Sequence, residues 1–171
     1  MKKIITLILT FILSISALAI VDFQGVNWRD EKSAIEPMFK NLKEEPSFKA
    51  GTQIFSAPAI DPHIKDYKFY FKDKQLYMIR ITFNNQVVGR EQIKTVYKKL
   101  TRTLGNPIAR KQIDKKVDSL KLQGNYIKFA PDIDTAVYYI GLDTIDADNN
   151  MIDSNLYLDY TDSRLNEDPE I

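Results

Sequence analysis

Few residues of this chain could carry out catalysis. His63 is the sole histidine, it lies in a loop beside Pro62, and no G-x-S-x-G sequence is present. A Ser-His-Asp hydrolase is therefore not indicated, and we expect a solvated loop histidine. One histidine without any cysteine cannot anchor a zinc site, and the six glycines are scattered singly rather than grouped in a phosphate loop. A hydrolase with two carboxylates stays open as an alternative, because paired acids need not be close in sequence.

A second cluster could bind a cation. Asp146, Asp148 and Asn150 place oxygen ligands at alternating positions, as calcium loops do. The pattern then fails, because Met151 stands where the sharp turn needs glycine and Tyr157 stands where the twelfth-position glutamate belongs. We expect a polar hairpin loop, with calcium binding by the three residues as the alternative.

The stretch 67–83 predicts a β-hairpin with candidate binding residues on one face. Apolar and polar side chains alternate on both sides of a short break at 73–75, which is the period of a half-buried strand. The polar face carries tyrosine, and exposed tyrosines can bind a partner because their rings give large contact area for little entropy loss. The alternative is solvated cross-strand aromatic pairs. The candidate binding residues of this hairpin and of the last strand are Lys68, Tyr70, Lys72, Arg80 and Tyr157.

Charge is distributed unevenly along a chain of net charge +1. Residues 90–121 contain ten basic and three acidic residues, whereas 132–171 contain eleven acids against Arg164. One interpretation is a basic patch, including Lys94, Lys98 and Arg102, for an anionic envelope component or an acidic protein. The alternative is charged surfaces that are merely solvated. The near-zero net charge argues against a general nucleic-acid binder.

The periodicity predicts an α+β fold that positions these residues. An apolar stripe over 90–104 ends before Gly105 and Pro107, which is typical of an amphipathic helix and its stop signals. A shorter stripe from Ile35 to Leu42, after Asp30 as N-cap, predicts another helix that is kinked at Pro37. We expect both helices on one face of an antiparallel sheet. The halves share this pattern at an offset of about 60 residues, so a duplication of helix-plus-strands units is possible.

The N-terminus has the features of an export signal. Lys2 and Lys3 precede an apolar stretch, and Ala17-Leu18-Ala19 supplies a small-x-small cleavage pattern. The alternative is an uncleaved anchor. We expect a signal peptide at 1–19, one domain at 20–163 and an acidic flexible tail at 164–171, without a transmembrane span after signal removal. The absence of cysteine favours a bacterial periplasmic or secreted protein.

Phe23-x-Gly25-Val26-x-Trp28, together with a later helix that ends Leu104-Gly105-x-Pro107, resembles uncharacterised bacterial envelope proteins. Those proteins begin F-x-G-I-x-W-G, and their fold is similar to that of small outer-membrane assembly lipoproteins and β-lactamase inhibitor proteins. The resemblance implies helices laid on an antiparallel sheet and an envelope location. This chain has Arg29 where the family has glycine, and it lacks the lipid-bearing cysteine.

From these observations we expect an exported, non-catalytic bacterial domain that uses no cofactor. It would bind an envelope protein or an anionic envelope component through its sheet face or its helix edge. A hydrolase with a carboxylate-based active site is the alternative, and a concave cluster of acids would favour it.

Overall fold

A computed structural model describes residues 23, 26–39, 41–47, 49–165 and 169 of the chain. The signal peptide predicted at 1–19 lies outside the described residues, as does most of the predicted acidic tail. Among the described helices, none is long and apolar enough to cross a membrane.

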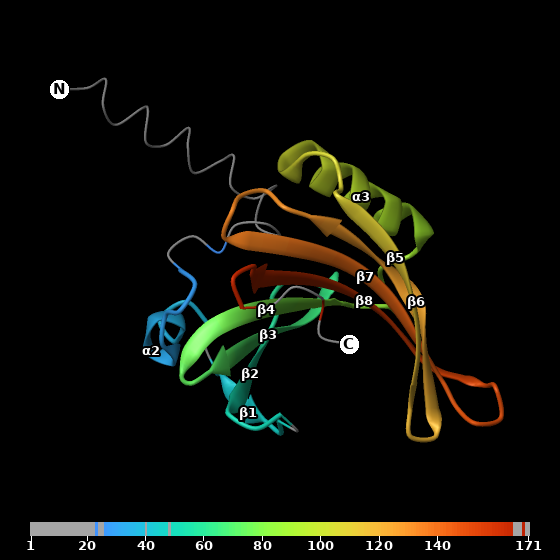
Figure 1. The fold of residues 1–171 in the computed structure, drawn as a ribbon, viewed down its shortest axis with the longest axis horizontal. Coiled ribbons are helices and arrows are strands. Elements are labelled where there is room, and N and C mark those ends of the chain that lie inside the picture. The colour runs from blue at the N-terminus through green and yellow to red at the C-terminus, as the bar shows by residue number, and fades with distance from the viewer. Residues whose placement is uncertain (1–22, 24–25, 40, 48, 166–168, 170–171) are drawn as a thin grey trace.

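Eight antiparallel strands form a single sheet (Figure 1). Their order in the sheet is β1-β2-β3-β4-β8-β7-β6-β5, so two four-stranded meanders meet at their last strands. The described helices are α2 and α3. The bounds are α2 Lys32–Ile35, β1 Lys43–Glu45, β2 Thr52–Pro58, β3 Ile64–Lys72, β4 Gln75–Phe83, α3 Arg90–Leu104, β5 Ala109–Val117, β6 Leu120–Phe129, β7 Thr135–Ile145 and β8 Met151–Asp162.

The predicted α+β class with two amphipathic helices is wrong, because the described chain is mainly sheet. The predicted first helix is a single turn of four residues that ends at Ile35. Pro37 lacks the N–H that would continue the helix, and Met38 is 41 % exposed rather than part of a buried stripe. Asp30 does not cap α2, since its carboxylate accepts the backbone N–H of Asn27 instead. The described elements do follow one order twice, a helix and then four strands, but the helices differ in length, with four residues in α2 and fifteen in α3.

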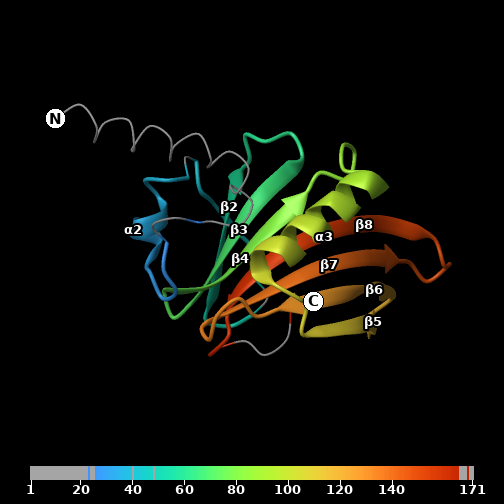
Figure 2. The ribbon, with the colours of Figure 1, turned by 90° about the horizontal axis from the view of Figure 1, so that it is seen from above.

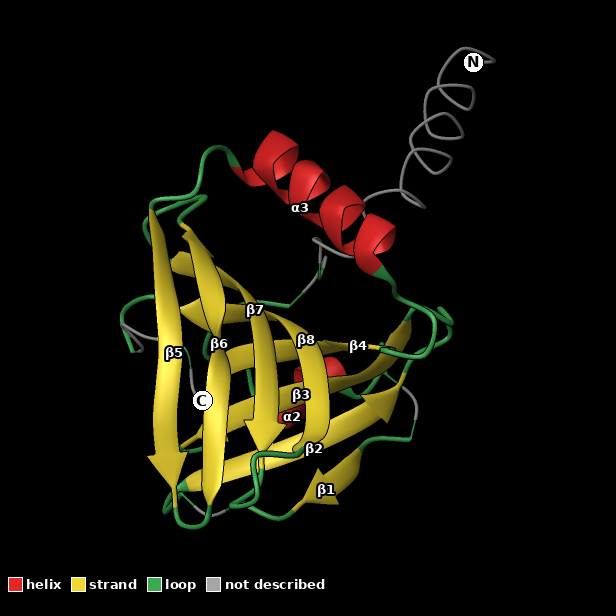
Figure 3. Ribbon diagram, turned by 90° about the vertical axis from the view of Figure 1, so that its right-hand side faces the viewer, coloured by secondary structure: helices red, strands yellow, loops and turns green. Residues whose placement is uncertain are grey.

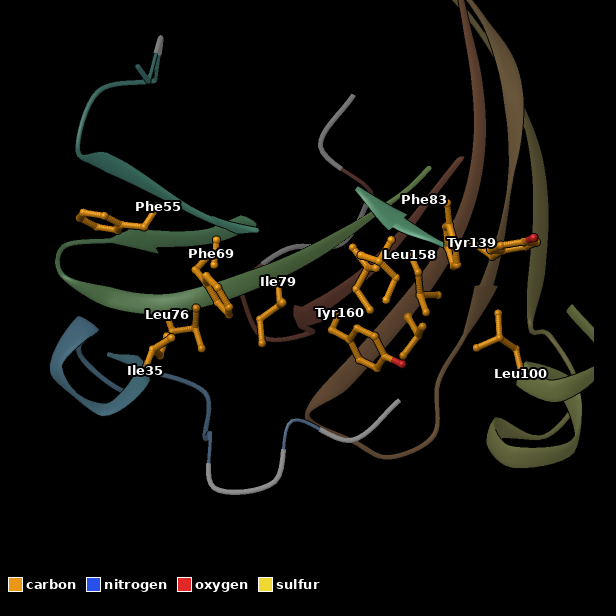
Figure 4. Close-up of a cluster of buried hydrophobic side chains, with 14 of the residues drawn as sticks. Ile35, Phe55, Phe69, Leu76, Ile79, Phe83, Leu100, Tyr139, Leu158 and Tyr160 are labelled. Atoms are coloured by element: carbon orange, nitrogen blue, oxygen red, sulfur yellow. The ribbon is translucent and has the colours of Figure 1, made fainter. Parts of the chain in front are cut away.

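One face of the sheet, here called the helix face, carries the main hydrophobic core. The side chains of this core form rows across the sheet, because the register places apolar side chains of successive strands side by side. Figure 4 shows these side chains on the side of the sheet where α2 and α3 lie. The central row is Phe55, Phe69, Ile79, Tyr160, Val137 and Phe129.

Helix α3 follows the sequence prediction and covers the second half of this face (Figure 2). Leu100 is buried in the core, and the Tyr139 hydroxyl donates to the carbonyl of Ile93 at 3.1 Å, which fixes the helix to β7. The Gln92 side chain accepts the N–H of Gly89 at the start of the helix, and Gly105 ends it with φ 85°. Burial raises the pKa of Tyr139.

The sheet is strongly bent, so its two meanders run at a steep angle to each other (Figures 1 and 3). The helices lie outside the bend, and the opposite face lines the inside. We call this second face the tyrosine face. Its two apolar clusters are built around Tyr126 and Tyr138 and around Tyr70 and Tyr77.

Candidate functional site

The structure divides the predicted binding residues between two surfaces. Lys68, Tyr70, Arg80 and Tyr157 come together on the tyrosine face, because β3, β4 and β8 are neighbours in the sheet and these residues lie in adjacent rows. Lys72 lies at the exposed end of β3. The three basic residues predicted for the helix edge, Lys94, Lys98 and Arg102, lie on α3 and therefore on the other side of the sheet.

A buried ion pair lies at the middle of the tyrosine face. Arg80 on β4 and Asp159 on β8 are direct cross-strand partners. Arg80 donates from Nε to Asp159 Oδ1 at 2.8 Å and from Nη2 to Oδ2 at 2.7 Å. The Asp159 side chain is fully buried and that of Arg80 is 15 % exposed. Such a bidentate geometry fixes both side chains and satisfies the carboxylate despite its burial.

Two tyrosines flank the guanidinium of this pair. Its carbon atom lies 4.5 Å from the ring centroid of Tyr157 and 5.8 Å from that of Tyr70, both within range of cation–π attraction. Burial disfavours the charged form of Arg80, but the attraction of Asp159 outweighs it and the pKa of Arg80 is raised. The pKa of Tyr157 is also raised, since burial outweighs the opposing effect of the Arg80 charge. The arginine is thus held charged between two tyrosine rings.

The row that contains the ion pair continues across the second meander, where the sequence analysis placed no site. Asp159 pairs with Tyr138, and Tyr138 pairs with Lys128. The ammonium of Lys128 lies 5.2 Å from the ring centroid of Tyr138, and the ring of Tyr126 meets the same ring at 5.6 Å. Sequence alternation places Tyr138 on one face of β7 and Tyr139 on the other. Only the strand pairing shows that Tyr138 is the one beside Asp159.

Asp66 is a further residue that the sequence analysis missed. It lies on β3 opposite Thr82, whose other cross-strand neighbour is Tyr157. Its Oδ1 atom is buried and has no hydrogen-bond partner among the residues that the structure describes. A buried carboxylate oxygen without a partner is energetically costly, so this atom offers an acceptor that a bound group could use.

Comparison of the chain with models of protein families, with curated proteins and with solved structures finds no match. The resemblance to bacterial envelope proteins therefore stays a prediction. The proposed function therefore rests on the geometry of the tyrosine face.

The basic residues of α3 form a looser arrangement. Lys94 pairs with Glu91 at 2.8 Å one turn earlier, and both side chains are largely exposed. Lys98 and Arg102 form no ion pair with a described residue. Exposed charges of this kind are solvated and contribute little to stability. Nothing on α3 matches the enclosed, bidentate geometry found at Arg80.

The loop predicted as an alternative calcium site uses its oxygens internally. Asp146 Oδ1 accepts the backbone N–H groups of Asp148 and Asn150 at 2.9 and 2.8 Å, and Oδ2 accepts the Asn150 amide at 3.1 Å. The bonds from Asn150 hold the pKa of Asp146 below its usual value. Over the described residues no group of three or more histidine, cysteine or acidic side chains is placed to hold a metal. These bonds explain the loop without a cation, and calcium binding stays a prediction.

His63 is placed as the sequence predicts, in an exposed loop. Its Nδ1 atom lies 2.9 Å from Asp61 Oδ1, and both side chains are about half exposed. The hydrogen bonds from His63 lower the pKa of Asp61. The pair stabilises the turn before β3 and lies away from the tyrosine face.

The carboxylate of Asp159 is fully engaged within the protein. Both carboxylate oxygens of Asp159 accept hydrogen bonds from Arg80, so this acid is not placed to exchange a proton with a substrate. Tyr70, Tyr126 and Tyr138 are themselves buried, so the predicted exposed tyrosine at position 70 is not found. The groups of this face that stay partly open to a partner are Tyr157 and the lysines of the same row.

Proposed function

We propose that this protein is an exported bacterial binding domain, without catalytic activity, whose tyrosine face holds an acidic protein segment of the cell envelope. The observation that carries the proposal is the Arg80–Asp159 pair flanked by Tyr70 and Tyr157. The leader-like sequence at 1–19 supports export.

Three properties of the face favour an acidic segment. Lys68 and Lys128 lie in the same cross-strand row as the ion pair, on either side of it. Counted over this row alone, Lys68, Arg80 and Lys128 stand against Asp159, so the row has more basic than acidic side chains. The partly exposed ring of Tyr157 favours contact with a protein, because a tyrosine buries much area without losing many rotamers. The sheet is bent, as Figure 3 shows, and the tyrosine face with its lysines lies on the inside of this bend.

A salt titration with two probes tests this function. Poly-L-glutamate represents an acidic chain, and lipopolysaccharide represents an anionic envelope component. We expect binding of poly-L-glutamate that weakens steeply as salt rises, because screening reduces attraction between the exposed charges. Binding of lipopolysaccharide alone would instead identify the envelope component as the partner, and the absence of any salt-dependent binding would contradict the proposal.

Matched double variants locate the site. The pair Lys68→Gln with Lys128→Gln removes two charges from the tyrosine face, and Lys94→Gln with Lys98→Gln removes two from α3. We expect about tenfold weaker binding in the first variant, equivalent to about 1.4 kcal/mol, and little change in the second. The opposite result would move the binding site to the helix.

A further inference from the structure

A second candidate site lies on the helix face, where three segments leave a pocket of about 470 Å³. Phe23 and residues 26–28 before α2, the end of α3 and the loop between β6 and β7 line it. The residues that decide its chemistry are Phe23, Trp28, Leu104, Asp132 and Tyr160. Its volume lies in the range of small-molecule sites. We call it the aromatic pocket.

The aromatic side chains of this pocket are fixed before any ligand binds. Trp28 donates from Nε1 to the Thr135 hydroxyl at 3.0 Å, which ties the indole to the start of β7. The ring of Phe23 meets that of Tyr160 edge to face, with the centroids 5.7 Å apart. Tyr160 itself projects from β8 on the same side as Ile79, which also lines the pocket (Figure 4). A ligand would therefore find preformed aromatic contacts and lose little binding energy in ordering them.

The charge at the pocket has one sign. Among the described residues that line it, the charged ones are Asp132 and Asp134. Asp134 pairs with Arg164 at 3.3 Å. Asp132 forms no ion pair with a described residue, and its Oδ1 accepts the backbone N–H of Asp134 at 2.8 Å, which fixes the carboxylate. Asp132 therefore adds an unneutralised negative charge to an aromatic pocket.

We propose that the aromatic pocket binds a small organic cation, an ammonium group attached to a compact apolar body. Aromatic rings attract cations through their quadrupole, and sites for substituted ammonium groups combine several such rings. The apolar body would contact Leu104 and Ile79, while the ammonium group would be neutralised by Asp132. An anionic ligand would meet repulsion from Asp132. This site is on the opposite side of the sheet from the tyrosine face, so it stands independently of the proposed function.

The single tryptophan makes the proposal directly measurable. Trp28 is the sole tryptophan of the chain, so ligand binding in the pocket changes the intrinsic fluorescence from one known position. Three probes share a phenyl ring and differ in charge: phenethylammonium, 2-phenylethanol and 3-phenylpropionate. We expect phenethylammonium to bind about tenfold more tightly than the alcohol, and the carboxylate to bind most weakly. Saturation-transfer NMR on each probe measures the same binding without the fluorophore.

Two variants decide whether the carboxylate is responsible. Asp132→Asn keeps the shape of the exposed side chain, and it should reduce the preference for phenethylammonium over the alcohol to about twofold or less. Asp146→Asn removes the same charge from the distant β7–β8 loop and should leave the preference unchanged. The proposal is overturned if the ammonium and the alcohol bind equally to the unmodified protein, or if Asp132→Asn retains the full preference. It is also overturned if neither fluorescence nor NMR detects binding of the ammonium probe.

Discussion

The two faces of the sheet bury their side chains in different ways. The helix face is covered by other parts of the chain, with Ile35 of α2 and Leu100 of α3 packed in the same core as the strand residues. The tyrosine face reaches burial by curvature and by pairing charges, since Asp159 is fully buried only together with Arg80. Apolar side chains must fill the core without voids, but their contacts do not depend on a particular orientation. The ion pair, in contrast, is stable only while its two side chains keep their hydrogen-bonding geometry. Changes in the packed core of the first face should therefore affect stability through lost packing, and changes at the ion pair of the second should affect it through an uncompensated charge.

The largest effect is expected at the centre of the helix face. Phe69 is fully buried and its ring meets those of Phe23 and Phe39. Phe69→Ala should lower the free energy of unfolding by about 4 kcal/mol, because it removes apolar burial and leaves a cavity. Urea denaturation measures the loss. Val87→Ala, at a residue that is 43 % exposed, is the control and should cost less than about 0.5 kcal/mol. A similar cost for both would mean that this face is not a packed core.

The ion pair of the tyrosine face gives the next largest effect. Asp159→Leu should cost about 3 kcal/mol, because it leaves the buried Arg80 guanidinium without its counter-charge. The double variant Arg80→Met with Asp159→Leu should cost less than this single change, since no charge is then left buried. Chemical denaturation of the two single variants and the double variant completes the cycle. Additive losses would show that the two side chains act independently, contrary to their bidentate contact.

A smaller effect tests the backbone of the second meander. A Cβ atom added at Gly124 on β6 would collide with the carbonyl oxygen of Gly141 on β7. Gly124→Ala should therefore cost about 2 kcal/mol, as overpacking does. Gly141→Ala is the matched control, because a Cβ there has no atom within 4 Å. Thermal unfolding of both variants compares them, and equal melting temperatures would contradict the close approach of the two strands.

The smallest effect concerns pH at the end of β8. Burial raises the pKa of Asp162, but the hydrogen bonds from Arg164 outweigh it and the pKa is lowered overall. Because the folded pKa lies below the unfolded value of about 4, this stabilisation is complete at neutral pH and is lost as the pH falls through the folded pKa. Melting temperatures of the unmodified protein and of Asp162→Asn should therefore converge on acidification. A constant difference between them down to pH 2 would contradict this assignment.

Local sequence patterns predicted part of the fold correctly. The hairpin of β3 and β4 and helix α3 form where the alternation and the apolar stripe indicate, because each is encoded within a short stretch of chain. The stripe around Ile35 has the same helical spacing, yet only four residues are helical there. This error arises because Pro37 lacks the backbone N–H that a longer helix would need, and this overrides the local preference.

The candidate site, like the fold, could be predicted only in part from the sequence. The sequence by itself determined that Lys68, Tyr70 and Arg80 share one face of a hairpin, because side chains alternate along a strand. Only the tertiary structure decided that β8 and not another strand lies beside β4, and this pairing brings Asp159 and Tyr157 to Arg80. The physical reason is distance along the chain. Arg80 and Asp159 are separated by 79 positions in the sequence. The order of strands that lie so far apart in the chain is set by the packing of the whole sheet rather than by any local pattern.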